Sequence, residues 1–97
     1  MGIYIPEENG GEGMDYMNYA IMIEEMKRSC GWTGVLISAN KSLAVWPILN
    51  FGTQEQKSKY LPKMATGEMV GCFCLSEPNA GSDPGTLATV AVDKGEY

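Results

Sequence analysis

The spacing of apolar side chains predicts helices along the first two thirds of the chain. Between residues 16 and 29 apolar residues recur every three or four positions, and Asp15 precedes them as a helix N-cap. A second helix is expected from about Thr33, with a kink or a restart at Pro47. Its large apolar residues form a stripe at helical spacing, which is typical of a buried core: Trp32, Leu36, Ala39, Leu43 and Trp46.

The third helix is predicted from its start signal. Thr53 and Gln56 make a capping box, in which each side chain satisfies a free backbone N–H of the first turn. The helix then covers about residues 54–65. Because glycine often ends helices in a left-handed conformation, Gly31 is expected to end the first helix and Gly67 the third.

The pattern changes from helical to alternating at Met69, which predicts strands. One strand is expected over residues 70–76 and another over 87–92, joined by a polar turn. The predicted fold class is therefore α+β, with three helices followed by the first strands of a sheet. A domain boundary is placed near residues 67–69. Because so few strands are not stable alone, the chain is expected to be a fragment that spans this boundary.

The polar turn after the first predicted strand has the clearest chemical character in the chain. Pro78 has no backbone N–H, while Asn79 and Gly81 tolerate positive φ, so the chain cannot stay regular after Ser76. Such a turn exposes backbone N–H groups and hydroxyls at a strand end, which suits an anionic or strongly polar ligand. An ordinary connection between strand and turn is the commoner explanation of the same pattern.

Composition narrows the function classes. The chain has 97 residues, of which 44% are apolar, and a formal net charge of −5. The apolar fraction is sufficient for a core. The absence of a basic stripe argues against binding to nucleic acid or to an anionic membrane. The sequence contains neither a recognisable targeting segment nor a transmembrane run.

Few residues are available for acid–base or metal chemistry. The chain has no histidine, which removes the commonest general base and most zinc sites. Cys30, Cys72 and Cys74 are expected to be reduced thiols, because Cys-x-Cys on one strand face is poor geometry for a disulfide or a tetrahedral zinc cage. No metal site is predicted. The glycines at 10–13 do not have the spacing of a dinucleotide or phosphate loop, so a plain helix-entry loop is favoured.

Three blocks in the same order and spacing resemble one family. Residues 74–83 (CLSEPNAGSD) resemble the signature of the acyl-CoA dehydrogenases. Residues 2–11 are similar to the loop before a central helix of that family's N-terminal α-domain. Residues 51–57, with 60–62 and 67–68, are similar to its last helix before the β-domain. Together the blocks cover nearly the whole chain, and the sequence looks most like the short-chain or short/branched-chain members.

The resemblance implies a domain organisation and an activity. Residues 1–68 would be the C-terminal part of the N-terminal all-α domain, and residues 69–97 the start of an antiparallel, barrel-like middle β-domain. The implied cofactor is FAD, and the implied reaction is α,β-dehydrogenation of a short-chain fatty acyl-CoA to trans-2-enoyl-CoA in fatty-acid β-oxidation. Electrons would leave through electron-transfer flavoprotein. The family suggests a homotetramer in the mitochondrial matrix or, in bacteria, the cytoplasm.

The resemblance also implies cofactor-binding roles, carried over by position, for Phe73, Leu75, Ser76, Gly81 and Ser82. Phe73, Leu75 and Ser76 would lie along the flavin ring, with the Ser76 hydroxyl hydrogen-bonded to it. Ser82 would lie near both the flavin and the acyl-CoA substrate.

No catalytic residue is predicted within the chain. In the family, the glutamate that removes the α-proton lies in the C-terminal α-domain, beyond the position of Tyr97, so the isolated chain is expected to lack dehydrogenase activity. Glu77 is expected to act as a local hydrogen-bond acceptor of the turn. Thr86 stands where the family usually has a smaller Gly, Ser or Ala, so the path of the turn after Asp83 need not follow the family's.

Two alternatives stay open. An acyl-CoA oxidase-like or other flavoprotein of the same superfamily would share the flavin strand and differ in its access to oxygen. A non-catalytic helical interaction fragment would instead use the apolar stripe of the second helix as a partner surface.

Overall fold

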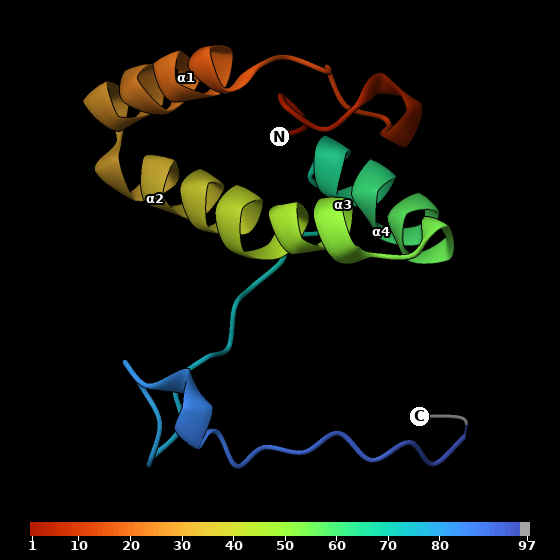
Figure 1. The fold of residues 1–97 in the computed structure, drawn as a ribbon. Coiled ribbons are helices and arrows are strands. Elements are labelled where there is room, and N and C mark those ends of the chain that lie inside the picture. Colours follow the sequence, from red (N-terminus) through yellow and green to blue (C-terminus); the bar gives the residue numbers. More distant parts are fainter. Residues whose placement is uncertain (96–97) are drawn as a thin grey trace.

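The structure is a computed structural model, and it describes residues 1–95. Its helices form the N-terminal part, and an extended segment leads away from them toward the C-terminus (Figure 1). The elements are α1 (Tyr16–Ser29), α2 (Gly31–Ala39), a π-helix (Asn40–Val45), α3 (Trp46–Phe51) and α4 (Gln54–Thr66), with short 3-10 turns at Glu7–Asn9 and Pro84–Thr86.

The predicted start signals of α1 and α4 are confirmed. Asp15 Oδ1 accepts a hydrogen bond from the Asn18 N–H at 2.9 Å and caps α1. The capping box of α4 is complete: the Gln56 N–H donates to Thr53 Oγ1 at 3.2 Å, and the Thr53 N–H donates to Gln56 Oε1 at 2.9 Å. Gly67 ends α4 with φ +86°, as predicted.

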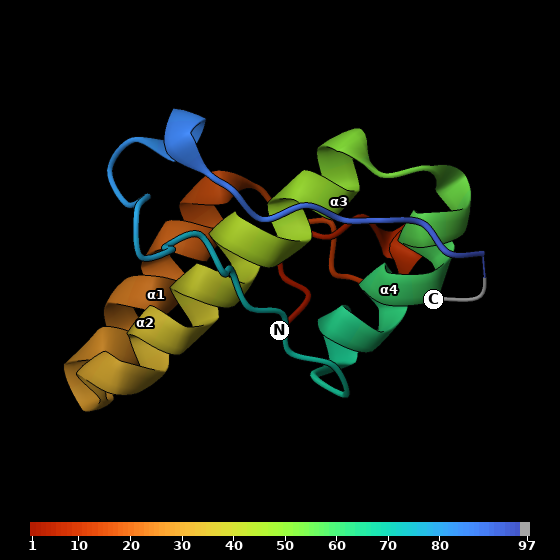
Figure 2. The same cartoon turned by 90° about the horizontal axis from the view of Figure 1, so that it is seen from below.

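The prediction that Gly31 ends the first helix is wrong. The turn is made one residue earlier by Cys30, which is extended at φ −154° and donates its N–H to the Met26 carbonyl. Gly31 is instead the first residue of α2. One extended residue therefore reverses the chain direction between α1 and α2, which lie side by side in Figures 1 and 2, without a left-handed glycine.

The disturbance predicted at Pro47 takes the form of a π-helix directly before it. The chain stays helical from α2 through α3 (Figure 1), and Trp46 keeps helical angles of φ −59° and ψ −46° despite preceding a proline. The Trp46 N–H donates to the Lys41 carbonyl, five residues back. Because this turn is wider than an α-turn, the helix accommodates the missing N–H of Pro47 without breaking.

The core lies where the N-terminal segment meets the π-helix and α4. A Cβ built on Gly2 would lie 2.9 Å from the Ala65 Cβ, so the segment and α4 are in close contact. The Tyr4 hydroxyl donates to the Lys41 carbonyl, which ties the segment to the π-helix. The buried hydrophobic residues of this cluster are Tyr4, Ile5, Val45, Leu61, Met64 and Ala65.

The apolar stripe that was predicted to be core is largely exposed. Trp32 is 74% exposed, and Leu36, Leu43 and Trp46 are each about 40% exposed. Val45, in the π-helix, is instead fully buried in the cluster that contains Tyr4 and Ile5 of the N-terminal segment. Helical spacing correctly identified an apolar face, but the partner that fills the core came from residues 3–5, which have no helical pattern.

The predicted strands do not form within the described residues 1–95. Segments 70–76 and 87–92 run as extended chain, and the backbone pairing in this part is a bridge between Glu77 and Ala80, with N–O distances of 2.8 and 3.1 Å. A strand requires a neighbour to accept its ladder hydrogen bonds. In Figure 2 the C-terminal segment overlaps α3 and α4, but Figure 1 shows that it lies well away from both helices. Neither helix therefore contacts the segment.

Candidate functional site

A buried asparagine fixes the start of the extended segment. Asn40 is 1% exposed, and its Oδ1 accepts the Gly71 N–H at 2.7 Å. A Cβ on residue 71 would overlap the Ala44 Cβ and lie 2.7 Å from the Met64 Cε. Gly71 is therefore required by close packing, and the π-helix determines where the following residues begin.

Apolar hollows lie on both sides of this anchor. The larger, about 430 Å³, is lined mainly by Leu43, Ala44, Ile48, Tyr60, Met64 and residues 69–72. The other, about 340 Å³, is lined mainly by Trp32, Val35, Leu36, Asn40, Leu43 and residues 70–73. The amide nitrogen of Asn40 is buried and has no hydrogen-bond partner among residues 1–95. The second hollow thus combines apolar walls with one amide, a combination found in sites for mostly apolar ligands.

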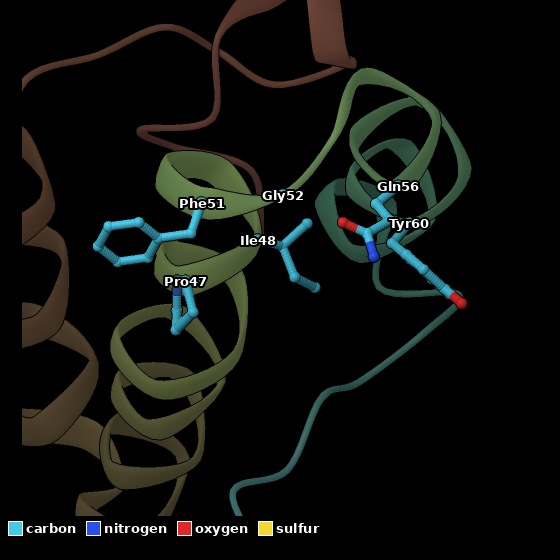
Figure 3. Close-up of a pocket in the computed structure, with 6 residues that line it drawn as sticks. All are labelled: Pro47, Ile48, Phe51, Gly52, Gln56 and Tyr60. Atoms are coloured by element: carbon cyan, nitrogen blue, oxygen red, sulfur yellow. The ribbon is translucent and has the colours of Figure 1, made fainter. Parts of the chain in front are cut away.

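A further hollow lies between α3 and α4 and is shown in Figure 3. It measures about 300 Å³ and is lined by Pro47, Ile48, Phe51, Gly52, Gln56 and Tyr60. Phe51 and Tyr60 lie on either side of Ile48, and the nearby amide belongs to Gln56 (Figure 3). None of these side chains is a strong acid, base or nucleophile at neutral pH. We therefore place the candidate site at the anchored segment and the turn that follows it.

The turn is closed by the Glu77 carboxylate, which confirms its expected role as a local acceptor. Its Oε2 accepts the Ala88 N–H at 2.9 Å and its Oε1 accepts the Thr89 N–H at 3.0 Å. Hydrogen bonds from the Thr89 side chain and then from the Ala88 N–H lower the pKa of Glu77. Glu77 is therefore ionised at neutral pH and holds the two ends of the turn together.

Thr86 uses its extra hydroxyl inside the same turn. The hydroxyl donates to the Asp83 carbonyl at 2.9 Å and is within 3.2 Å of the Asn79 carbonyl. The Asp83 carboxylate accepts the Gly85 N–H at 3.0 Å and starts the 3-10 turn Pro84–Thr86. The hydroxyl of Thr86 thus makes contacts within the turn that a Gly or Ala at this position could not make.

The turn brings the predicted cofactor residues onto one short stretch. The bridge between Glu77 and Ala80 folds the chain back, so Ser76 and Gly81 lie beside its two ends. Leu75 is half-buried, whereas Ser76, Gly81 and Ser82 are exposed and Phe73 is 53% exposed. A Cβ built on Gly81 meets no atom within 4 Å, so this part of the turn is open.

Sequence reasoning missed Asn40 and Lys41. Both are buried, and Asn40 positions the whole stretch. A signal was present, because three consecutive polar residues, Asn40, Lys41 and Ser42, interrupt an apolar stretch between Ala39 and Leu43. Buried polar groups are nearly always hydrogen-bonded, so a polar residue within an apolar helix indicates a specific contact.

We expect Glu77→Gln to loosen the turn. The neutral amide keeps one acceptor oxygen and loses the charge that strengthens both hydrogen bonds, so the Ala88 and Thr89 amides should exchange with deuterium several-fold faster at neutral pH. In the unmodified chain the same loss should occur as the pH falls below about 4.5, through the lowered pKa of Glu77, because the carboxylate is then protonated.

Glu55→Gln, on the exposed first turn of α4, is the matched control for this measurement. It should leave both amides unchanged. Equal exchange in the Glu77 variant and the unmodified chain would show that the carboxylate does not hold the turn.

The comparisons with known proteins agree with this architecture. A family model described as the acyl-CoA dehydrogenase N-terminal domain matches residues 1–68. The mitochondrial short-chain specific acyl-CoA dehydrogenase of Bos taurus is 48% identical over 96 residues, which are 99% of this chain and 23% of the relative. An acyl-CoA dehydrogenase of Bacillus subtilis is 46% identical over 100% of this chain and 26% of its own length.

Solved structures give the same result in three dimensions. A structure from work on the electron transferring flavoprotein of Acidaminococcus fermentans and flavin-based electron bifurcation superposes with a TM-score of 0.91 at 49% identity, covering 97% of this chain and 25% of that chain. An acyl-CoA dehydrogenase from Bacillus anthracis complexed with FAD superposes with a TM-score of 0.79 at 41% identity, covering 86% of this chain and 14% of that chain.

The helices pack on their N-terminal segment, and the family model matches this part of the chain, residues 1–68. The helical part is therefore an N-terminal domain of the acyl-CoA dehydrogenase type. The similarity to the dehydrogenases continues through the polar turn and over nearly the whole chain. The chain belongs to the acyl-CoA dehydrogenase family. It spans about a quarter of the length of the curated relatives it matches.

The described residues also bear on membranes and metals. Within residues 1–95, no helix combines the length and apolar character needed to cross a bilayer. Over the same range, histidine, cysteine and acidic residues do not gather in groups of three or more that could hold a metal ion.

Proposed function

We propose that this chain is a fragment of a FAD-dependent acyl-CoA dehydrogenase that converts a short-chain fatty acyl-CoA to trans-2-enoyl-CoA. One observation carries the proposal: identity of 46–49% to short-chain specific dehydrogenases of mammalian mitochondria over 94–99% of the chain. Residues 1–68 belong to the N-terminal α-domain in this proposal, and residues 69–97 begin the middle β-domain.

The anchored segment fits a flavin site. Phe73 presents an exposed aromatic face, and Ser76 offers an exposed hydroxyl at the end of the segment. We assign Phe73, Leu75 and Ser76 to contacts with FAD, together with Gly81 in the open part of the turn. The unpartnered amide nitrogen of Asn40 supports a bound polar group nearby, since a buried donor without an acceptor is costly. When bound, FAD supplies the acceptor for the hydride that leaves the substrate.

Substrate contacts are assigned to the turn and to the neighbouring hollow. Ser82 is exposed on the turn and is placed to meet both the flavin and the acyl-CoA. The hollow between α2 and residues 70–73 has walls of Trp32, Leu36 and Leu43, which suit a short acyl chain. The apolar lining would orient the chain and exclude water from its α and β carbons.

Glu77 is not assigned as the base that removes the α-proton. Both of its oxygens accept backbone hydrogen bonds and its pKa is lowered, so it is a weak base committed to the turn. By itself, the chain is expected to show no dehydrogenase activity.

The proposal includes partners and a location. Electron-transfer flavoprotein would accept the electrons, and the full-length protein would be a homotetramer. Relatives from mitochondria and from Bacillus subtilis support the mitochondrial matrix or, in bacteria, the cytoplasm as the compartment.

The test uses the full-length protein that carries this sequence. Anaerobic addition of butyryl-CoA should bleach the flavin absorbance, and reoxidation in air should be slow. Rapid reoxidation would favour the oxidase-like alternative, and an absence of bleaching with acyl-CoA substrates would contradict the proposal. Ser76→Ala should weaken FAD binding about tenfold through the loss of one hydrogen bond. Ser58→Ala, on the exposed side of α4, should leave FAD binding unchanged.

One observation favours a second candidate, the non-catalytic helical interaction fragment. The stripe from Trp32 to Trp46 is exposed, as a partner surface would be. Such a fragment would bind neither FAD nor CoA, whereas quenching of flavin fluorescence by the chain would exclude this candidate.

A further inference from the structure

The carbonyl of Lys41 joins two parts of the structure that are distant in sequence. It accepts the N–H of Trp46, which closes the wide turn of the π-helix, and it also accepts the hydroxyl of Tyr4. A carbonyl oxygen has two lone pairs, so both bonds form together. In an α-helix the helical donor to this oxygen would be the N–H of Val45, one residue earlier. The Tyr4 hydroxyl therefore holds the oxygen on which the wide turn closes.

The same π-helix determines the position of Gly71. Asn40, the residue before Lys41, accepts the Gly71 N–H through its Oδ1 at 2.7 Å, and a Cβ on residue 71 would overlap the Cβ of Ala44. Both contacting residues belong to the π-helix. Because neighbouring residues of a helix turn together, a change at Lys41 also moves the Asn40 side chain. Segment 73–76 begins two residues after Gly71 and moves with it.

We propose that Tyr4 is a positioning residue for the segment assigned to FAD, and that it acts through the π-helix and Asn40. The inference rests on the proposed function for the role of segment 73–76. Tyr4 is buried, which favours a lasting contact. Burial, followed by the neighbouring phenols of Tyr19 and Tyr16, raises the pKa of Tyr4, so its hydroxyl stays protonated and can donate at neutral pH.

Tyr4→Phe isolates the contribution of the hydroxyl. The ring is kept, and with it the contact to the Lys41 ammonium, which lies 5.1 Å from the ring centre. The Lys41 carbonyl keeps the Trp46 N–H as its partner, so the substitution does not leave it unpaired. Tyr16→Phe is the matched control, because Tyr16 is 63% exposed and its ring centre lies 5.6 Å from that of Tyr4.

The first test is deuterium exchange of single amides in the full-length protein that carries this sequence, without FAD. Tyr4→Phe should speed exchange of the Gly71 N–H about three- to tenfold, the range for the loss of one hydrogen bond. The Lys57 N–H, which donates to the Thr53 carbonyl at 2.9 Å in α4, should exchange as before. In the Asn40→Ala background, Tyr4→Phe should have no further effect on residue 71, since the connecting bond is already absent.

Unchanged exchange at Gly71 would overturn the inference. Equal acceleration at Gly71 and Lys57 would do the same, because it would indicate a general loss of stability. Additive effects of Tyr4→Phe and Asn40→Ala would show that the two residues act separately. These measurements need no flavin, so their failure would leave the proposed function intact.

The second test is the affinity of the same proteins for FAD, followed by quenching of flavin fluorescence. Tyr4→Phe should raise the dissociation constant about threefold, since the loosening at Gly71 reaches the residues that contact the flavin. Tyr16→Phe should leave the constant unchanged, and Tyr4→Phe should have no effect on it in the Asn40→Ala background. Unchanged affinity together with faster exchange at Gly71 would contradict the assignment of segment 73–76 to the flavin, and with it the positioning role.

Discussion

Gly11→Ala should lower the free energy of unfolding by more than about 3 kcal/mol, because overpacking against backbone cannot be relieved by a side-chain rotation. A Cβ at residue 11 would overlap the carbonyl oxygen of Ile5 and lie 2.5 Å from the Ile5 Cβ. Ile5 is fully buried in the core, so it cannot move away. The N-terminal loop would have to open, and with it the packing of residues 3–5 on α4.

The local hydrogen bonds add to this cost. The Gly11 N–H donates to the Pro6 carbonyl at 3.2 Å, and the Gly13 N–H donates to the Ile5 carbonyl at 2.9 Å. Both bonds hold the loop against Ile5. The new methyl group would overlap the Ile5 carbonyl oxygen, which accepts the second of these bonds. Close packing thus explains Gly11, whereas Gly10 and Gly13 adopt positive φ of 80° and 61°, which favours glycine.

Urea unfolding measures the effect, and Gly31→Ala is the matched control. A Cβ at residue 31 meets no atom within 4 Å, and the position is the start of α2, where alanine favours the helix by up to about 1 kcal/mol. A loss below about 1 kcal/mol at residue 11, or equal losses at both positions, would contradict the overlap with Ile5.

Lys41→Met should stabilise the chain by about 2 kcal/mol at pH 7, because it removes an unpaired charge from the interior. Lys41 is fully buried, and its Nζ has no hydrogen-bond partner within the described residues. The ammonium lies 5.1 Å from the centre of the Tyr4 ring and 5.8 Å from that of Tyr19, so two aromatic faces offset part of the cost.

The pH dependence gives the sign of this effect. Burial lowers the pKa of Lys41 from 10.5 to about 8. Below pH 8 the lysine is charged in both states, and the folded state bears a cost of about 3 kcal/mol before the aromatic contacts are counted. Between pH 8 and 10.5 the folded state releases its proton first, so stability rises with pH. The methionine variant should lack this rise.

The measurement is the difference in urea stability between the two chains from pH 7 to 9.5. Burial also raises the pKa of Tyr4, which destabilises the folded state above pH 10, and the chosen range avoids that effect. Lys59→Met, on the exposed side of α4, should change stability by less than about 0.5 kcal/mol at all pH values. A difference at Lys41 that is independent of pH would show that its charge is not the cause.

Local signals predicted the helices well because each acts within one turn. The caps at Asp15 and Thr53 and the glycine at 67 fix helix ends through neighbouring atoms alone. The burial of the second helix could not be predicted in the same way. Its apolar stripe and the opposite face both contain large apolar residues. Which of the two faces is buried depends on where residues 3–5 pack.

The sequence predicted which stretch of the chain carries the candidate site, but not the contacts that shape it. The residue types at 71–85 indicated a polar turn, and the structure closes that turn through Glu77, Asp83 and Thr86. Pairing of residues 70–76 and 87–92 depends on a neighbouring strand, so alternation along the chain was not sufficient to form a sheet. Asn40 was missed because its contact with Gly71 spans thirty-one residues of sequence.

The π-helix has a consequence for how this chain tolerates changes in length. A residue added to an α-helix turns everything beyond it by about 100°, which would move Val45 out of the core. The widened turn at Asn40–Val45 takes up such an additional residue locally. It also lets consecutive residues serve different neighbours, since the Asn40 side chain holds Gly71 while the Lys41 carbonyl holds Tyr4. The widened turn therefore joins the N-terminal segment and the start of the extended segment through two adjacent residues, so a change in length within residues 40–45 should separate these two contacts.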